Sequence, residues 1–453
     1  MNNKIFSTFI LVLLVVAGLF ALYCLPAPFV GGKKLRHVDI LSDVRPDVVL
    51  PVDTDTVALP PLVIKPEFVD TCKTGMTCIE DYADSTSRGM SHFYECLING
   101  EHLRRPIRIA YLGDSFIEAD ILTGDLREKL QAAFGGCGVG YLPITSRITG
   151  FRQTVKHTFS GWSAHSVMDS TYFDRSRQDL SNHYFIPTSG AYVAFKGTKH
   201  KSFLDSCEVS SCFFSAKDSV LLTSQINGGE ETPHHLVADG HVMQAQIMGR
   251  MHDIKWRVQA ADSATFYGVA LEGRKGIVLD NLSLRGGSGQ QLLKVPMATL
   301  RQFNKLRPYD LIILQYGLNV ASAEVSNYSY YTEAMKEVVT HLKAAFPEAS
   351  FLIIGVGDRC NRNEDGELST MPGIKNLIRY QQLLAAETHV AFWNMFQAMG
   401  GERSMIRMVE EGMANYDYTH INFKGGKYLA DLLFETLMYG KEQHEKRLTY
   451  ENQ

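Results

Sequence analysis

The feature that most constrains the fold of this 453-residue chain is its hydrophobic period, which changes twice along the sequence. Residues 107–112 form an apolar run of strand length, and residues 120–134 follow with apolar side chains at helical spacing. From residue 150 to about residue 265 the sequence instead contains short runs of Val, Phe, Tyr and Thr, separated by Gly, Ser, Asn and Asp. Such runs are typical of antiparallel strands. The first pattern then returns, which indicates that one unit is interrupted by another.

The outer segments predict an α/β unit. After the interruption we expect strands at 277–284, 311–316, 351–356 and 390–393, and helices at 332–346, 374–386 and 423–438. Strands separated by helices predict a parallel sheet with helices on both faces. We therefore predict a three-layer α/β/α domain formed by residues 71–150 and 266–440. A β-sandwich over residues 151–265 would be inserted between its two parts, and a polar tail, residues 441–453, would follow.

The N-terminus carries an almost uninterrupted apolar stretch over residues 5–24, long enough to cross a bilayer. Residues 1–30 are therefore predicted to be a membrane anchor or a signal segment. The lack of a small-x-small cleavage site favours the uncleaved anchor. Residues 31–70 are rich in Val, Pro and Asp without a helical period, which predicts an extended linker.

Charge and cysteine content narrow the class of protein. A net charge of −4 without a basic tract argues against a nucleic-acid partner. Among the eight cysteines, Cys72 and Cys78, and also Cys207 and Cys212, are close enough in sequence to form small disulfide loops in an oxidising compartment. Spacing alone equally allows free buried thiols. The sequence leaves the oligomeric state open.

Polar residues follow two of the predicted strands and precede the final helix. Gly113-Asp114-Ser115 comes directly after the run 107–112, and Asn319 follows the run 311–316. Asp417 and His420 lie three positions apart before the final helix. A serine hydroxyl becomes a nucleophile when an imidazole removes its proton, and a third group must orient that imidazole. The carboxyl edge of a parallel sheet, where these residues would gather, is where open α/β folds bind ligands.

Each of these residues also has an ordinary structural role. Ser115 could be a turn serine, Asn319 could cap a helix, and Asp417 could be an exposed loop carboxylate. The order of the motifs and their places after predicted strands favour a catalytic site.

In these motifs the sequence resembles the SGNH (GDSL-type) hydrolase family. Ser115 matches the first motif, Asn319 the third, and Asp417 with His420 the last. The second motif requires a glycine after a middle strand, which Gly286 matches best, with Gly287 as the alternative. The third motif departs from the commoner form because Val320, rather than Asp, follows Asn319.

The β-rich interruption and the sequence around Ser115 resemble one group within this family, the peptidoglycan O-acetylesterases and O-acetyltransferases. The resemblance implies a carbohydrate-binding-module-like insert between the first and second motifs. It implies a serine esterase that removes O-acetyl groups from a cell-envelope or other polysaccharide glycan, with peptidoglycan favoured. Two alternatives remain, an O-acetyltransferase that uses the same residues and a catalytically inactive glycan-binding protein.

The resemblance also assigns roles to the residues. Ser115 would be the nucleophile, His420 the general base and Asp417 the group that orients His420. The oxyanion hole would consist of the backbone N–H groups of Ser115 and Gly286 and the side-chain amide of Asn319. No cofactor and no metal ion is implied.

The expected partners are an acetylated glycan substrate and the membrane, which the N-terminal segment would contact. Lys33, Lys34 and Arg36 after the apolar segment argue against export by the positive-inside tendency. The family resemblance and the usual role of single N-terminal apolar segments argue for it. We expect a protein anchored in the inner membrane with its body in the periplasm or outside the cell, or a protein secreted after signal cleavage.

Overall fold

The computed structural model describes residues 72–451, apart from 86, 170–171, 262 and 364–365, together with short stretches among the first 34 residues. Near the N-terminus, β1 (Phe29–Val30) and β2 (Lys33–Lys34) form an antiparallel pair. Most of the expected anchor, and nearly all of the expected linker, lie outside the described residues. In the part of the chain that is described, no helix combines the length and the apolar character that a membrane span requires.

The α/β part is built on a six-stranded sheet, whose strands lie in the order β14–β4–β15–β16–β19–β3. In that order the strands are Ile277–Ser283, Ile107–Gly113, Leu311–Gln315, Ser350–Ile354, Ala391–Trp393 and Glu80–Asp81. The first five pair in parallel, and β3 joins antiparallel at the edge. The predicted α/β class and its parallel strands are confirmed. The antiparallel edge strand makes the sheet mixed.

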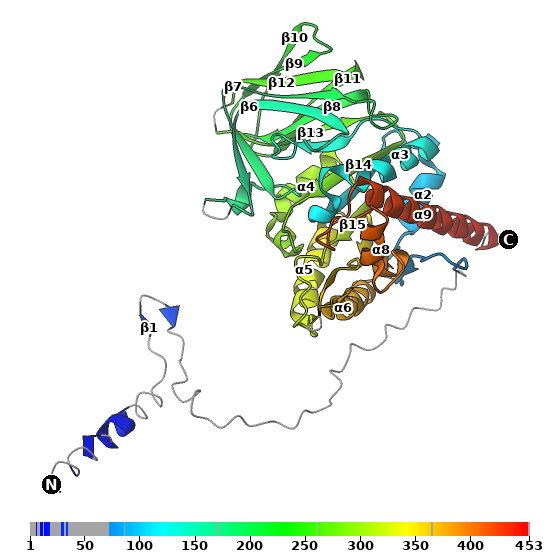
Figure 1. Cartoon of the computed structure of the whole chain (residues 1–453). Helices are drawn as coiled ribbons and strands as arrows, with labels where there is room; N and C mark the ends of the chain where they lie inside the picture. Colours follow the sequence, from blue (N-terminus) through cyan, green and yellow to red (C-terminus); the bar gives the residue numbers. More distant parts are fainter. Residues whose placement is uncertain are drawn as a thin grey trace. The chain divides into compact units, whose positions relative to one another are not determined.

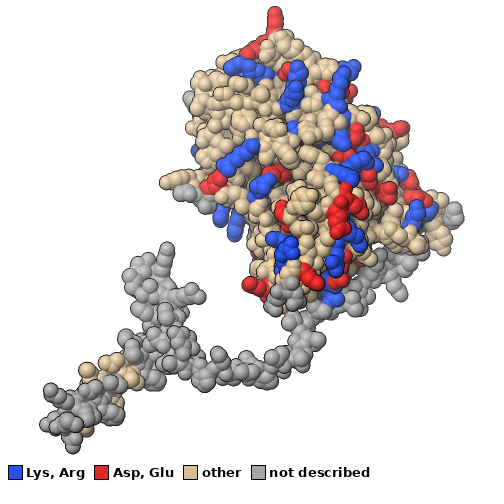
Figure 2. Space-filling view, viewed as in Figure 1, with Lys and Arg blue, Asp and Glu red and all other residues tan. Residues whose placement is uncertain are grey.

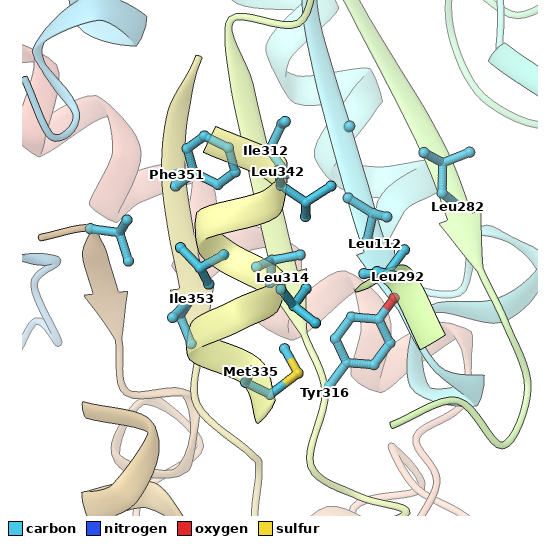
Figure 3. Close-up of a cluster of buried hydrophobic side chains, with 14 of the residues drawn as sticks. Leu112, Leu282, Leu292, Ile312, Leu314, Tyr316, Met335, Leu342, Phe351 and Ile353 are labelled. Atoms are coloured by element: carbon cyan, nitrogen blue, oxygen red, sulfur yellow. The ribbon is translucent and has the colours of Figure 1, made fainter. Parts of the chain in front are cut away.

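Helices cover both faces of this sheet. Side chains alternate along β4, so Ala110 and Leu112 enter one buried cluster while Ile109 and Tyr111 enter the other. The first cluster packs against α4 (Met297–Leu306), α5 (Ser329–Ala345) and α6 (Gly373–Glu387), as Figure 3 shows for α5. The second packs against α2 (Ser91–Ile98), α3 (Thr123–Phe134), α8 (Ser404–Glu410) and α9 (Phe423–Glu451).

Short elements complete the α/β part. They are α7 (Met395–Ala398), the antiparallel pair β17 (Cys360–Arg362) and β18 (Leu368–Thr370), and the 3₁₀ turns η2 (Gly100–His102), η3 (Ser115–Asp120) and η5 (Gln290–Lys294). Helix α9 is longer than the predicted 423–438, so residues 441–451 continue this closing helix.

The β-rich segment forms a separate nine-stranded sheet in which every pairing is antiparallel. Its strands β5 to β13 are Gly140–Pro143, Val155–Ser166, His183–Gly197, Cys207–Ser215, Val220–Ile226, Glu231–Leu236, Val242–Met251, Asp253–Ala260 and Thr265–Glu272, with η4 (Arg175–Arg177) between β6 and β7. A hydrophobic cluster around Trp256, Phe195 and Phe266 fills this unit. Hydrogen bonds join all nine strands into one sheet, so the expected sandwich of two sheets is not confirmed.

The nine-stranded sheet reaches beyond the expected insert at both ends. Strand β5 begins at Gly140, and β13 continues to Glu272. A buried group of charges joins this sheet to the central one. Arg307, just after α4, donates to Asp280 of β14 at 2.7 and 2.8 Å and to Glu272 of β13 at 2.6 Å. Figure 1 shows the nine-stranded sheet above the central sheet in this view.

The cysteines divide into two kinds. Cys72 and Cys78 form a disulfide, as one of the sequence alternatives allowed. Cys207 and Cys212 are free and buried. Both belong to β8, and five positions along an extended strand span about 17 Å, which is too far for a disulfide. On the molecular face that Figure 2 shows, acidic and basic side chains are interspersed.

Candidate active site

Strand β4 places Ser115 at the carboxyl edge of the central sheet. The strand ends at Gly113, and Ser115 is the first residue of the 3₁₀ turn η3. Asp114 between them is extended, and its carboxylate accepts the Phe116 N–H at 2.9 Å, which caps the turn. A Cβ at position 113 would lie 3.0 Å from the Gln315 carbonyl oxygen of the neighbouring strand β15, so glycine suits this close approach. Ser115 is largely buried, with 8% of its surface exposed.

The loop before α9 brings His420 to Ser115. The Nε2 atom of His420 lies 3.0 Å from the Ser115 hydroxyl oxygen. Its Nδ1 atom lies 2.8 Å from one carboxylate oxygen of Asp417. The carboxylate accepts the Nδ1 proton, so Nε2 is the acceptor for the serine O–H. Although 305 residues separate them in sequence, the serine and the imidazole are in hydrogen-bond contact.

Asp417 is itself held by the loop backbone. Its second carboxylate oxygen accepts the backbone N–H groups of Thr419 and His420, each at 3.0 Å. Partial burial raises the pKa of Asp417, but the hydrogen bonds from His420 and Thr419 outweigh this effect, so the pKa lies below its ordinary value. Asp417 is therefore ionised at neutral pH, and its carboxylate holds the His420 ring through Nδ1.

Asn319 reaches the same place from the loop after β15. Its side-chain nitrogen donates to the Asp114 carboxylate at 3.2 Å and to the Gly287 carbonyl oxygen at 3.0 Å. Asn319 thus lies next to the residue that precedes Ser115. Both of its N–H groups have protein acceptors here.

The turn after β14 distinguishes Gly286 from Gly287. The Gly287 N–H already donates to the Leu284 carbonyl oxygen at 2.9 Å, and Gly287 is buried. Gly286 is exposed and has φ +77°, in the left-handed region that glycine adopts without strain. The Leu284 N–H bonds to the Gly113 carbonyl oxygen at 2.9 Å, which fixes this turn beside the serine. Of the two glycines, Gly287 therefore has its backbone N–H engaged within the turn.

Asp114 is a residue of the site that the sequence reasoning did not single out. Only 2% of its surface is exposed. Burial raises the pKa of Asp114 to about 6, although the Phe116 N–H and nearby His420 both limit the rise. A carboxylate directly between an apolar run and the predicted nucleophile was the available signal.

Within residues 72–451, leaving out the gaps named above, one group of side chains has metal-ligand chemistry, His92, Cys96 and Asp310. Asp310 directly precedes β15, and His92 and Cys96 belong to α2. The group therefore lies at the amino edge of the sheet, opposite the carboxyl edge that carries Ser115. The oxygens of Asp310 already accept two Arg105 N–H groups, at 2.7 and 2.8 Å, and the Arg108 backbone N–H at 2.9 Å. Burial raises the pKa of Cys96 to about 12, which disfavours the thiolate that binds metals. We assign no metal to this group.

Comparisons with known proteins complete the description. Neither a protein-family model nor a curated protein sequence matches this chain. Among solved structures, that of a peptidoglycan O-acetylesterase is 20% identical, covers 81% of this chain and 99% of its own, and has a TM-score of 0.65.

Two other solved structures are more distant. A family two carbohydrate esterase from Clostridium thermocellum, in complex with cellohexaose, is 10% identical, covers 57% of this chain and 96% of its own, and has a TM-score of 0.27. A putative GDSL-like lipase from Parabacteroides merdae is 13% identical, covers 36% of this chain and 74% of its own, and has a TM-score of 0.28. We base no argument on these two. The chain thus shares the fold of a solved peptidoglycan O-acetylesterase, in agreement with the resemblance that its motifs indicate.

Proposed function

We propose that this protein is a serine esterase that removes O-acetyl groups from a glycan. The observation that carries the proposal is the hydrogen-bonded chain from Ser115 through His420 to Asp417, with contacts of 3.0 and 2.8 Å. A hydroxyl, an imidazole and a carboxylate in this order are the parts that acyl transfer by a serine nucleophile requires.

In the first half of the proposed reaction, the Ser115 hydroxyl oxygen attacks the carbonyl carbon of the acetyl ester. His420 takes the serine proton on Nε2 as the new C–O bond forms. The bond between the carbonyl carbon and the sugar oxygen then breaks, and His420 gives the proton to that oxygen. The products of this half are a free sugar hydroxyl and an acetyl group on Ser115.

In the second half, a water molecule takes the place of the sugar. His420 removes a proton from the water, whose oxygen attacks the acetyl carbon. The bond to Ser115 breaks, the serine oxygen regains a proton from His420, and acetate leaves. Asp417 stabilises the imidazolium ion in both halves.

Each half passes through a tetrahedral intermediate with a negative oxygen. The donors that we assign to it are the backbone N–H groups of Ser115 and Gly286 and the side-chain amide of Asn319. Asn319 is exposed, so an oxyanion can reach its amide. The oxyanion then has to replace the Asp114 carboxylate or the Gly287 carbonyl oxygen as the acceptor of one amide N–H. Such donors stabilise the transition state because the charge that they meet develops during the reaction.

The glycan that we favour is peptidoglycan, because the solved structure with which this chain shares its fold is that of a peptidoglycan O-acetylesterase. We also propose that the body of the protein functions in the cell envelope or outside the cell. The Cys72–Cys78 disulfide supports this location, because structural disulfides persist in oxidising compartments. Digestion of intact spheroplasts by an added protease tests it, and a fully protected body would contradict it.

The test of the activity is acetate release from O-acetylated peptidoglycan by the wild type and by Ser115→Ala and His420→Ala. We expect each variant to lose about a thousandfold or more in kcat. Ser329→Ala, at the start of α5, is a matched control that should keep full activity. Wild-type rates in either site variant would remove that residue from the mechanism. Acetyl transfer to a sugar acceptor instead of acetate release would identify a transferase.

A further inference from the structure

A cavity of about 350 Å³ lies beside the proposed active site, between the central sheet and the nine-stranded sheet. One wall comes from Glu118 and Ala119 of η3 and from the residues at the end of β14. Another wall comes from β6 and β7. Ser115 begins the same turn η3, so the cavity starts within a few residues of the nucleophile.

Hydroxyl groups occur on several sides of this cavity. Those of Ser146 and Ser166 accept backbone N–H groups two positions later in the chain, at 3.2 and 3.3 Å. A hydroxyl that accepts a hydrogen bond keeps its own O–H to donate. Thr145 and Ser283 add further hydroxyls to the lining. The cavity can therefore donate to and accept from a ligand that is itself rich in hydroxyl groups.

The cavity also has a fixed ring in its wall. His165 of β6 stacks on Tyr184 of β7, with the ring centres 4.5 Å apart and the planes 6° from parallel. The Ser163 hydroxyl lies 3.1 Å from the His165 Nε2 atom, so a hydrogen bond also restrains the ring. A ring fixed in this way offers both a polar nitrogen and a flat surface to a ligand.

The charges in the lining are paired. Arg147 pairs with Asp169 at 3.2 Å, Arg152 with Asp120 at 2.6 Å, and Arg285 with Glu118. Burial lowers the pKa of His183, which keeps this ring of the lining neutral at pH 7. Paired arginines leave little net charge to attract a phosphate or a nucleotide, so the lining suits a neutral, hydroxyl-rich molecule.

We propose that this cavity is a glycan subsite, which holds a neutral sugar unit of the same chain whose acetyl ester reaches Ser115. The proposal rests on the proposed function and adds to it the part of the enzyme that recognises the polymer. The volume falls at the lower end of the range of about 300–1000 Å³ for small-molecule sites, which suits a short piece of glycan. A small acetyl ester does not need the subsite, whereas a polymeric substrate does.

The test compares two substrates, p-nitrophenyl acetate and O-acetylated peptidoglycan. Ala164→Trp would fill the cavity from an exposed position of β6, and His165→Ala would remove its ring. The matched control is Thr158→Trp, an exposed position of the same strand outside the cavity. We expect both cavity variants to raise KM for peptidoglycan about tenfold, with kcat/KM for the small ester within about twofold of the wild type. The control should leave both KM for peptidoglycan and kcat/KM for the small ester unchanged.

Two outcomes would overturn the subsite: wild-type KM for peptidoglycan in both cavity variants, or equal losses on the two substrates. Failure of the proposed function looks different, because the wild type would then hydrolyse neither ester. In that case calorimetry with soluble peptidoglycan fragments still decides the subsite. The subsite proposal predicts that Ala164→Trp weakens the binding of these fragments about tenfold, and unchanged binding would contradict the proposal.

Discussion

The interaction of Asp114 with Asn319 orients the amide that we assign to the proposed oxyanion hole. The buried carboxylate of Asp114 holds the Phe116 N–H on one oxygen and the Asn319 amide on the other. Asn319 is thereby oriented before any substrate arrives, although it lies on an exposed loop. Preorganised donors stabilise a developing charge more than donors that must reorient.

Replacement of Asn319 by alanine tests this role. We expect Asn319→Ala to lower kcat about a hundredfold or more, with little change in KM, because the oxyanion exists only during the chemical step. Asn99→Ala, which removes an exposed amide that donates to the Glu95 carbonyl oxygen at the end of α2, is a suitable control. Steady-state kinetics with p-nitrophenyl acetate give both constants. A kcat within about threefold of the wild type would show that the amide does not bind the oxyanion.

Asp114 also makes stability depend on pH. Burial raises its pKa from 3.8 to about 6, so the folded protein binds this proton more tightly than the unfolded chain does. The resulting stabilisation is complete below pH 3.8 and is lost as the pH rises to about 6. Asp114→Asn removes this titration.

Urea unfolding at several pH values measures the effect. Relative to Asp114→Asn, the wild type should lose about 2–3 kcal/mol of unfolding free energy between about pH 4 and about pH 7. The comparison with the variant cancels the contributions of other carboxyl groups that titrate in this range. A difference that stays constant over the same range would contradict the assignment.

At the scale of the elements, the buried charges around Arg307 join the two sheets. Arg307 is 1% exposed, and it neutralises both Asp280 of β14 and Glu272 of β13. Arg108 of β4 provides a second cation for Glu272, at 2.7 Å. The group thus fixes β13 against the two strands that position Ser115 and Gly286.

The loss of Arg307 should therefore be costly. We expect Arg307→Met to lower the free energy of unfolding by about 3–5 kcal/mol, because it leaves the buried Asp280 carboxylate without a cationic partner. Arg301→Met changes an exposed arginine of the adjacent helix α4 and should have little effect. Urea denaturation of both variants measures the difference. Equal stabilities would mean that the buried group does not hold the sheets together.

The sequence predicts the long elements well because a continuous apolar run identifies a strand that is buried on both faces. The runs 107–112 and 311–316 correspond closely to β4 and β15. Strand β3 has two residues and no period that could reveal it. The sequence places the end of helix α9 too early, at residue 438, whereas the helix continues to Glu451. Its later turns are polar, and a hydrophobic pattern cannot show where a polar helix ends.

For the molecule as a whole, the change of period locates the interruption but not its edges. Strands β5 and β13 look like parts of the α/β unit in sequence, yet they hydrogen-bond to each other in the nine-stranded sheet. Pairing between distant strands depends on tertiary contacts, which local patterns do not contain. The candidate catalytic residues Ser115, His420 and Asp417 could be named because motifs mark them, and the structure brings the three into contact. The contact of Asp114 with Asn319 could not be predicted, because it joins loops that are 205 residues apart in sequence.

The disulfide gives a prediction for the intact protein. We expect protein isolated from its native cells to contain Cys72 and Cys78 joined, because residues 72–79 are fixed in place by contacts of Thr77 with Trp393 and Thr436. Alkylation of the unfolded protein before proteolysis should modify the free cysteines Cys96, Cys137, Cys207, Cys212 and Cys360. Peptide mass mapping identifies the modified residues. Alkylated Cys72 and Cys78 would contradict both the disulfide and an oxidising location.

The most direct test of the central claim is the site at which a fluorophosphonate reacts with the protein. The reagent modifies a serine only when a neighbouring base activates it. We predict one adduct, on the peptide that contains Ser115, which is lost in both Ser115→Ala and His420→Ala. An adduct on another serine, or undiminished labelling of Ser115 in His420→Ala, would contradict the proposal that these two residues form the reactive centre.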